Sequence, residues 1–187
     1  SHLVEAAADP KLGERERYPV FVSGQENLER LRERVSAVLT PSEMERIEWR
    51  VLPPDIRERP RLEGGIEAHG LLFLPHPYVV PGGRFNEMYG WDSHFINLGL
   101  LSAGRVDQAR QMVENHLYQV EHYGRVLNAN RTYYLTRSQP PFLASMVADV
   151  YRYQPAPAWA GKALPALNET YRFWTSDMHL TPETGLS

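Results

Sequence analysis

Apolar residues recur at helical spacing through much of the second half of the chain. After the turn at residues 81–83, the first such stretch ends at Gly104, a typical helix stop. A second stretch runs over residues 106–120 and ends at Gly124. Few residues separate the two, which favours an antiparallel pair of helices. The apolar positions are Trp91, Phe95, Leu98 and Leu101 in the first stretch and Val106, Ala109, Val113, Leu117 and Val120 in the second.

Two more helices are predicted after this pair. One carries an apolar face, and the other begins near Pro157 and runs to about Trp174. No alternating pattern is long enough to predict a sheet, so the predicted class is all-α. The pattern does not distinguish an open solenoid of hairpins from a closed double ring. The apolar face of the first of these helices consists of Leu143, Met146, Val147 and Val150.

The N-terminal part has weaker signals. Residues 1–26 show no sustained period and are interpreted as an arm packed on a larger body. Asn27 is a candidate N-cap for a helix over residues 28–39, and Thr40–Glu43 has the pattern of a capping box for a second helix to about Val51. Residues 53–65 are rich in proline, glycine and charge, which predicts a linker or wrapping loop. Prolines at 75 and 77 exclude a central strand over residues 71–80.

Charge and composition exclude several classes of function. The net charge is -3 and the pI is about 6.2, so binding driven by nucleic-acid phosphates is not expected. No apolar stretch reaches the roughly 20 residues that a membrane span needs. The chain has no cysteine, and His116 and His122 do not share a helical face, so neither a metal nor a cofactor is predicted. The compartment stays open between cytoplasm and periplasm or secretion.

Two polar loops carry the candidate chemistry. Residues 81–92 combine arginine, carboxylates, tyrosine and tryptophan just before a helix, which suits the hydroxyls and the C–H face of a sugar. An alternative is structural: Arg84 pairs with Glu87, Trp91 is core, and Asp92 is an N-cap. Residues 128–141 repeat the mixture one hairpin later. In an antiparallel array both loops emerge at the same end, so they are predicted to line one pocket.

The quoted segments resemble a known enzyme family. PGGRFNEMYGWD followed by SHFINLGLL is similar to the trehalase signature, and LNANRTYYLTRSQPPF is similar to the family's second N-terminal block. The resemblance covers roughly residues 71–174. It implies an (α/α)6 barrel of six helical hairpins, with residues 1–70 as an N-terminal arm and wrapping segment. Residues 71–187 are then an incomplete N-terminal portion of the barrel, holding the first two to three hairpins.

The resemblance also implies an activity, the inverting hydrolysis of α,α-trehalose to two glucoses. Such hydrolysis uses an acid and a base about 6.5 to 9.5 Å apart. In trehalases both lie downstream of the second block, so they are expected beyond residue 187 and no catalytic residue is assigned here. The expected partners are trehalose and the C-terminal part of the same barrel. By resemblance, the glucose contacts come from Arg84, Phe85, Tyr89, Trp91, Asp92, Asn128, Arg137 and Gln139.

Two positions depart from the family pattern, and alternatives stay open. His94 stands where trehalases usually carry tyrosine, and it is either a group near the sugar or a partly buried packing residue. Ala129 replaces a usual glycine, which matters if the position needs positive φ. Glu87 with Asp92 is a further, alternative acid and base pair. Other possible functions are hydrolysis of another α-glucoside and a non-catalytic helical module that binds a disaccharide.

Overall fold

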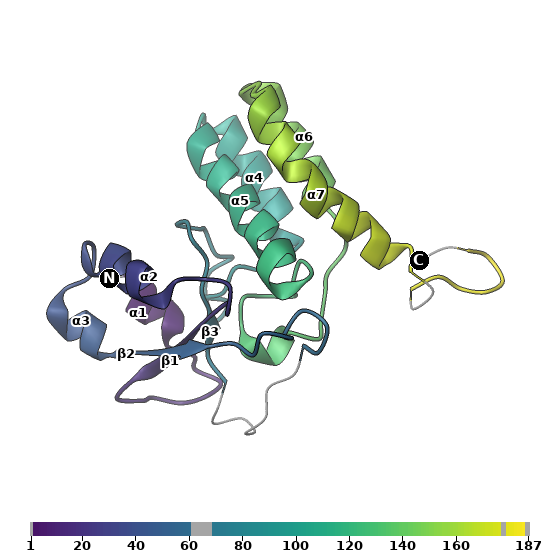
Figure 1. Ribbon diagram of the computed structural model, residues 1–187. Helices are drawn as coiled ribbons and strands as arrows, with labels where there is room; N and C mark the ends of the chain where they lie inside the picture. Colours follow the sequence, from purple (N-terminus) through teal and green to yellow (C-terminus); the bar gives the residue numbers. More distant parts are fainter. Residues whose placement is uncertain (1, 61–68, 177–178, 186–187) are drawn as a thin grey trace.

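The computed structural model describes residues 2–60, 69–176 and 179–185. Figure 1 shows two regions, an N-terminal one of short helices beside a small sheet and a C-terminal one of four longer helices. Residues 179–185 extend away from the end of the last helix. Among the described residues, no helix combines the length and the apolarity needed to cross a membrane. One core cluster of buried apolar side chains joins the N-terminal region to α5 (Val106–Tyr123) through Met112, Tyr118 and Tyr123, and the other lies among the four longer helices.

The N-terminal region contains a three-stranded parallel sheet that the sequence analysis did not predict. The central strand β1 (Tyr18–Val22) pairs with β2 (Ile47–Val51) on one side and with β3 (Leu71–Leu72) on the other. All five residues of β1 are buried. A strand buried on both faces has a continuous apolar run instead of an alternating one, which is why the search for alternation missed it.

The predicted helical caps are confirmed, but one predicted helix is too long. The Asn27 side chain accepts from the Arg30 backbone N–H at 2.9 Å and begins α2 (Leu28–Ser36). Thr40 and Glu43 form the predicted capping box of α3 (Pro41–Glu45). The helix does not continue to Val51, because its following residues form β2 against β1. A further helix, α1 (His2–Ala7), lies in the part that was interpreted as an arm.

The C-terminal region consists of α4 (Asp92–Ser102), α5 (Val106–Tyr123), α6 (Leu143–Tyr153) and α7 (Pro157–Trp174). These bounds confirm the predicted helices, and the left-handed Gly124 (φ 84°) ends α5 as expected. Each helix packs on the next, while α4 also contacts α6 and α5 also contacts α7. Alternate helices therefore form two layers, as in a double ring of hairpins.

The packed face of α4 differs from the predicted one. Leu101 is buried, but Trp91, Phe95 and Leu98 are each more than a third exposed. The buried positions include Ser93 and Asn97, whose side chains donate to the backbone carbonyls of Tyr89 (2.6 Å) and Ala109 (3.0 Å). Because α4 is apolar around much of its circumference, spacing alone could not identify the face that packs.

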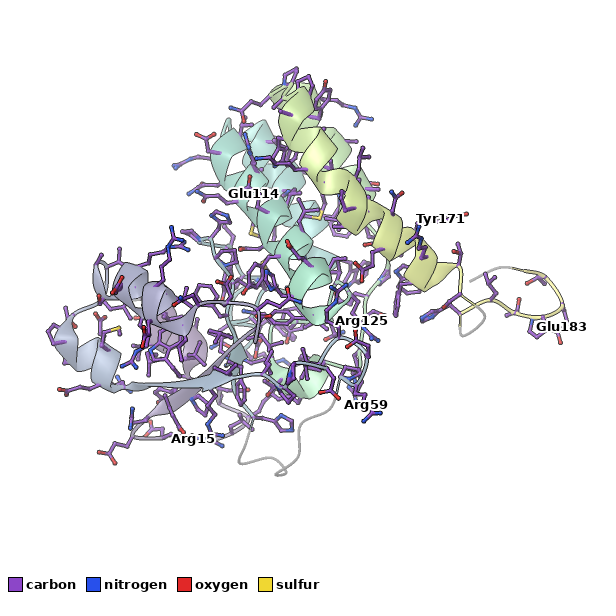
Figure 2. The ribbon with its side chains drawn as sticks, in the orientation of Figure 1. Arg15, Arg59, Glu114, Arg125, Tyr171 and Glu183 are labelled. Carbon is purple, nitrogen blue, oxygen red and sulfur yellow. The ribbon has the colours of Figure 1, made fainter. Side chains whose placement is uncertain are left out.

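Side-chain contacts join the helices to each other and to the N-terminal region. Glu114 in the middle of α5 accepts from the Trp159 indole N–H of α7 at 3.1 Å (Figure 2). Beyond the end of α5, the Arg125 guanidinium lies 4.9 Å from the centre of the Phe173 ring. Arg57, from the predicted linker, forms an ion pair with Glu169. Gly64 and Gly65, which were part of that prediction, lie outside the described residues.

Candidate functional site

The two polar loops lie against each other at the N-terminal ends of α4 and α6. We call residues 81–91 the first loop and residues 124–142 the second loop. Tyr89 and Ala129 form an antiparallel bridge, and the Gly90 N–H donates to the Asn128 carbonyl at 3.1 Å. The backbone N–H of Trp91 donates to the Gln139 side-chain oxygen at 2.7 Å. The prediction that both loops emerge at the same end of the hairpins is confirmed.

Gly90 makes this close approach possible. A Cβ atom at this position would lie 2.9 Å from the Leu127 carbonyl oxygen and 3.0 Å from the Gln139 side-chain oxygen. Both distances are too short for carbon and oxygen without a shift of the loops. The absence of a side chain at Gly90 therefore sets how closely the first loop can approach the second.

A ladder of rings connects the arginines of the two loops. The Arg84 guanidinium lies 4.9 Å from the centre of the Phe85 ring. The rings of Phe85 and Tyr89 pack edge to face, with their centres 5.5 Å apart. The ring centres of Tyr89 and of Tyr134 in the second loop are 6.4 Å apart, and the Arg137 guanidinium lies 6.0 Å from the Tyr134 ring centre. A continuous series of contacts thus runs from Arg84 of the first loop to Arg137 of the second. We call these five side chains the ring ladder.

Exposure within the ring ladder suits a ligand site. Arg84, Phe85 and Arg137 are exposed, whereas Tyr89, which lies between Phe85 and Tyr134, is buried, with 8% of its surface exposed. Burial raises the pKa of the Tyr89 hydroxyl above its usual value, and the negative charge of Glu87 raises it further. The hydroxyl therefore keeps its proton at neutral pH and can donate as well as accept. The two ends of the ladder are therefore exposed guanidinium groups, and the exposed ring beside Arg84 is Phe85.

The remaining candidates lie at the edge of this surface. Trp91 is 42% exposed and its ring centre lies 5.8 Å from that of Phe95, so it does not pack in the core of this chain. Asp92 is the first residue of α4 and half-buried, and the N-cap position belongs to Trp91 without a side-chain bond, so the alternative of an Asp92 cap is wrong. Asn128 and Gln139 hold the first loop through the bonds described above.

Glu87 braces the site instead of taking part in it. Its side chain has no exposed surface, and one carboxylate oxygen lies 3.3 Å from Arg131 Nε and 3.4 Å from Lys11 Nζ. The alternative ion pair with Arg84 is therefore wrong. A carboxylate without exposed surface cannot reach a glycosidic oxygen, so the alternative of Glu87 and Asp92 as acid and base is also unsupported.

Two residues that the sequence analysis left unassigned hold the loops together. Asn130 is fully buried; its side-chain oxygen accepts from the Met88 N–H at 2.8 Å, and its nitrogen donates to the Leu72 carbonyl at 3.3 Å. It thereby joins both loops to β3. Tyr134 is the ring of the ladder that the second loop supplies, between Tyr89 and Arg137. The sequence signal for both was their place within the second polar block, and spacing alone did not distinguish them from their neighbours.

The two departures from the family pattern have simple structural explanations. The His94 ring stacks on Phe142 at 4.7 Å, and its Nδ1 lies 3.9 Å from an Asp149 carboxylate oxygen, which confirms the packing interpretation. No described residue other than glycine has a positive φ, so Ala129 adopts an ordinary backbone conformation. Neither position disturbs the contact between the loops.

Comparison with known proteins extends the resemblance towards the N-terminus. The family model described as Trehalase matches residues 5–187. The cytosolic neutral trehalase of Emericella nidulans is 53% identical over 120 residues, covering 62% of this chain and 16% of that protein. The periplasmic trehalase of Xanthomonas campestris pv. campestris is 48% identical over 115 residues, covering 61% of this chain and 20% of that protein.

A solved structure supports the same relationship. Neutral trehalase Nth1 from Saccharomyces cerevisiae matches with a TM-score of 0.84 and 35% sequence identity. The match covers 100% of this chain and 38% of the yeast chain. The chain thus spans a fifth or less of the two curated relatives and under two fifths of this structure.

Proposed function

The chain belongs to the trehalase family, and we propose that it forms the glucose-binding part of an enzyme that hydrolyses α,α-trehalose. The pairs α4–α5 and α6–α7 are two of the six hairpins of the (α/α)6 barrel. The N-terminal ends of α4 and α6 face the same side, so both site loops contribute to one pocket of that barrel. The active enzyme then needs the remaining hairpins as well.

The observation that carries this proposal is the ring ladder. A glucose ring has hydroxyls at its edge, which need donors and acceptors, and C–H faces that pack on aromatic rings. Arg84 and Arg137 offer charged donor forks, and Phe85 with Tyr89 offers ring surface between them. The proposed glucose contacts are Arg84, Phe85, Tyr89, Trp91, Asp92, Asn128, Arg137 and Gln139.

The proposed mechanism divides the work between this chain and the rest of the barrel. Inversion requires an acid that protonates the glycosidic oxygen and a base that activates water. We assign neither role to this chain, whose loops bind and orient the sugar. Asp92 is the proposed hydroxyl acceptor at the start of α4, where the helix dipole favours a carboxylate. Fixed orientation of the sugar is itself a large part of the rate enhancement.

The test measures glucose release from trehalose by the full-length protein with Arg84→Ala or Arg137→Ala. Each variant loses charge-assisted bonds to the sugar, so kcat/KM should fall about 10- to 100-fold, with an unchanged melting temperature. Arg105→Ala is the matched control, because Arg105 is exposed in the α4–α5 turn, at the far end of both helices from the loops. Unchanged kinetics in both site variants contradict the assignment.

Substrate identity needs its own comparison. The wild-type protein is given trehalose and, separately, other α-glucosides at equal concentration, and free glucose is measured. Cleavage of trehalose above the others is expected. Cleavage of another α-glucoside without cleavage of trehalose contradicts the proposed substrate. Tight binding of trehalose by the full-length protein without any glucose release contradicts hydrolysis and favours a binding role.

A further inference from the structure

The first part of the predicted arm, residues 2–11, is bonded to both site loops, and from here on we call these residues the N-terminal arm. Arg131 of the second loop is fully buried, and its guanidinium donates to the carbonyls of Ala6, Ala7 and Ala8 at 2.7, 3.1 and 3.3 Å. These carbonyls belong to the C-terminal turn of α1, where a helix leaves its last acceptors without internal partners. One arginine of the second loop therefore caps the helix of the arm.

The first loop is attached to the same turn. The Asn86 side-chain nitrogen donates to the Ala8 carbonyl at 2.9 Å. Glu87 meets the Arg131 Nε at 3.3 Å and the Lys11 ammonium at 3.4 Å. Both loops are thus bonded to a short segment that lies more than 70 residues earlier in the sequence. The sequence of the loops by itself does not predict these bonds to a distant segment.

The charges beneath the loops are balanced. Asp9 and Glu87 are buried carboxylates, Arg131 is a buried cation, and Lys11 is a half-exposed one, at 46% of its side chain. Arg131 Nε lies 3.8 Å from Asp9 and 3.3 Å from Glu87. Buried charges are tolerated when they are paired and hydrogen-bonded in this way. Such a set of directional bonds specifies one arrangement of the three segments more narrowly than apolar contact does.

The second loop is held through Tyr133. Its hydroxyl donates to Asp9 at 2.7 Å. Burial raises the pKa of the Tyr133 hydroxyl, as does its bond to Asp9, so it stays a donor at neutral pH. The next residue is Tyr134, the ring of the ladder that the second loop supplies, and the Lys11 ammonium lies 5.9 Å from the centre of that ring. A displacement of Tyr133 therefore moves the ring between Tyr89 and Arg137.

We propose that the N-terminal arm is a positioning element of the sugar site, acting through Asp9 on Tyr133 and through the α1 C-terminal turn on Arg131 and Asn86. This assigns the arm a functional role that goes beyond coverage of the barrel, and it rests on the proposed sugar site. Asp9, Tyr133 and Arg131 are positioning residues, because none of them belongs to the proposed glucose contacts and each acts through another residue. Small displacements at a site have large kinetic effects, about 100-fold for about 1 Å.

The experiment uses the full-length protein with Asp9→Ala, Tyr133→Phe and both together. Amide hydrogen exchange is followed in residues 84–91 and 128–139 and, as internal reference, in α5. Exchange in both loops should accelerate about tenfold in Tyr133→Phe, with α5 unchanged, because one bond to a charged group is lost. Asp9→Ala should accelerate it at least as much, because it also removes the carboxylate beside Arg131. Loop exchange in the double variant should be no faster than in the more affected single variant, since both substitutions remove the bond between Tyr133 and Asp9.

Three variants complete the design. Asp9→Asn keeps an oxygen acceptor for the Tyr133 hydroxyl and should restore most of the loop protection. Asp55→Ala and Tyr153→Phe are the matched controls, because both residues are exposed and lie outside the loops and the arm. Both controls should have the exchange pattern of the wild type. In kinetics with trehalose, Asp9→Ala and Tyr133→Phe should raise KM more than they lower kcat, while Asp9→Asn returns KM towards the wild-type value.

The outcomes separate the two proposals. Loop exchange that stays at the wild-type rate in Asp9→Ala and Tyr133→Phe overturns the positioning role, whatever the kinetics show. Equal acceleration in the loops and in α5 also overturns it, because it indicates a general loss of stability. If the wild-type protein releases no glucose from trehalose, the proposed function fails, and the exchange measurements still decide whether the arm orders the loops.

Discussion

The helical layers and the base of the site are held by different forces. Between α4, α5, α6 and α7 the buried contacts are mostly apolar, from residues such as Val113 and Val147. Beneath the loops, the buried groups are ionic, with Arg131 and Glu87 both at 0% exposure. Apolar packing depends mainly on volume and tolerates substitutions that conserve it, whereas a buried ion network depends on the position of each atom. We therefore expect the four packed helices to tolerate substitutions that conserve volume. The buried ionic groups beneath the loops, which we call the loop base, should tolerate few substitutions.

The strongest test of this difference is Arg131→Met. Methionine keeps much of the side-chain length but removes the charge, which leaves the buried Glu87 with the half-exposed Lys11 as its cationic partner and deprives the carbonyls of Ala6, Ala7 and Ala8 of their donor. Loss of one partner of a buried pair costs about 3 to 5 kcal/mol. Denaturant unfolding of the full-length protein should show a loss in this range.

The matched control for that variant is the double substitution Arg131→Met with Glu87→Gln. It removes both charges and leaves the opposite charges of Asp9 and Lys11, so part of the lost stability should return. A double variant less stable than Arg131→Met alone contradicts the view that the uncompensated carboxylate is the main cost.

The same comparison explains what the sequence could predict. The helices α5, α6 and α7 were predictable because each has one apolar and one polar face, as in the run from Leu143 to Val150. The face of α4 was not, since apolar residues surround much of it. The sheet was not predicted, because β1 pairs with strands that begin at Ile47 and Leu71, far from it in the sequence. Local periodicity carries no information about such distant pairing.

The candidate site divides in the same way. The two polar blocks were visible as composition, and their meeting followed from hairpin geometry. Arg131 was not distinguished from an ordinary solvated arginine, because its main acceptors are the backbone carbonyls of Ala6, Ala7 and Ala8. Every residue has a backbone carbonyl, so the residue type does not indicate which carbonyls accept a bond from an arginine. The proposed ligand contacts could be assigned from the sequence through its resemblance to trehalases, whereas Arg131 and its partners had to be found in the structure.

A smaller effect is expected from the one histidine buried in the apolar wall. Burial lowers the pKa of His116 on α5 from 6.5 to about 4. The unfolded imidazole therefore binds a proton at a higher pH than the folded one. The contribution to stability is complete above pH 6.5 and is lost as the pH falls towards 4.

The measurement is the free energy of unfolding of the full-length protein and of His116→Gln at about pH 7 and about pH 5. The wild type should lose about 2 kcal/mol more than the variant over this interval, because glutamine does not titrate. Equal pH dependence in the two proteins contradicts a neutral, buried His116. It would also mean that this part of the wall is more open to water than its apolar neighbours indicate.

The smallest effect should come from the ion pair that joins the two regions, Arg57 with Glu169. Both side chains are partly exposed, at 28% and 40%, so water already screens the pair. Glu169→Gln should therefore change the free energy of unfolding by less than about 1 kcal/mol, although Arg131→Met, also the loss of one charge, has a several-fold larger effect. A cost for Glu169→Gln as large as that of Arg131→Met would show that burial does not distinguish these pairs. In that case the exacting contacts extend from the loop base to the surface between α7 and the N-terminal region.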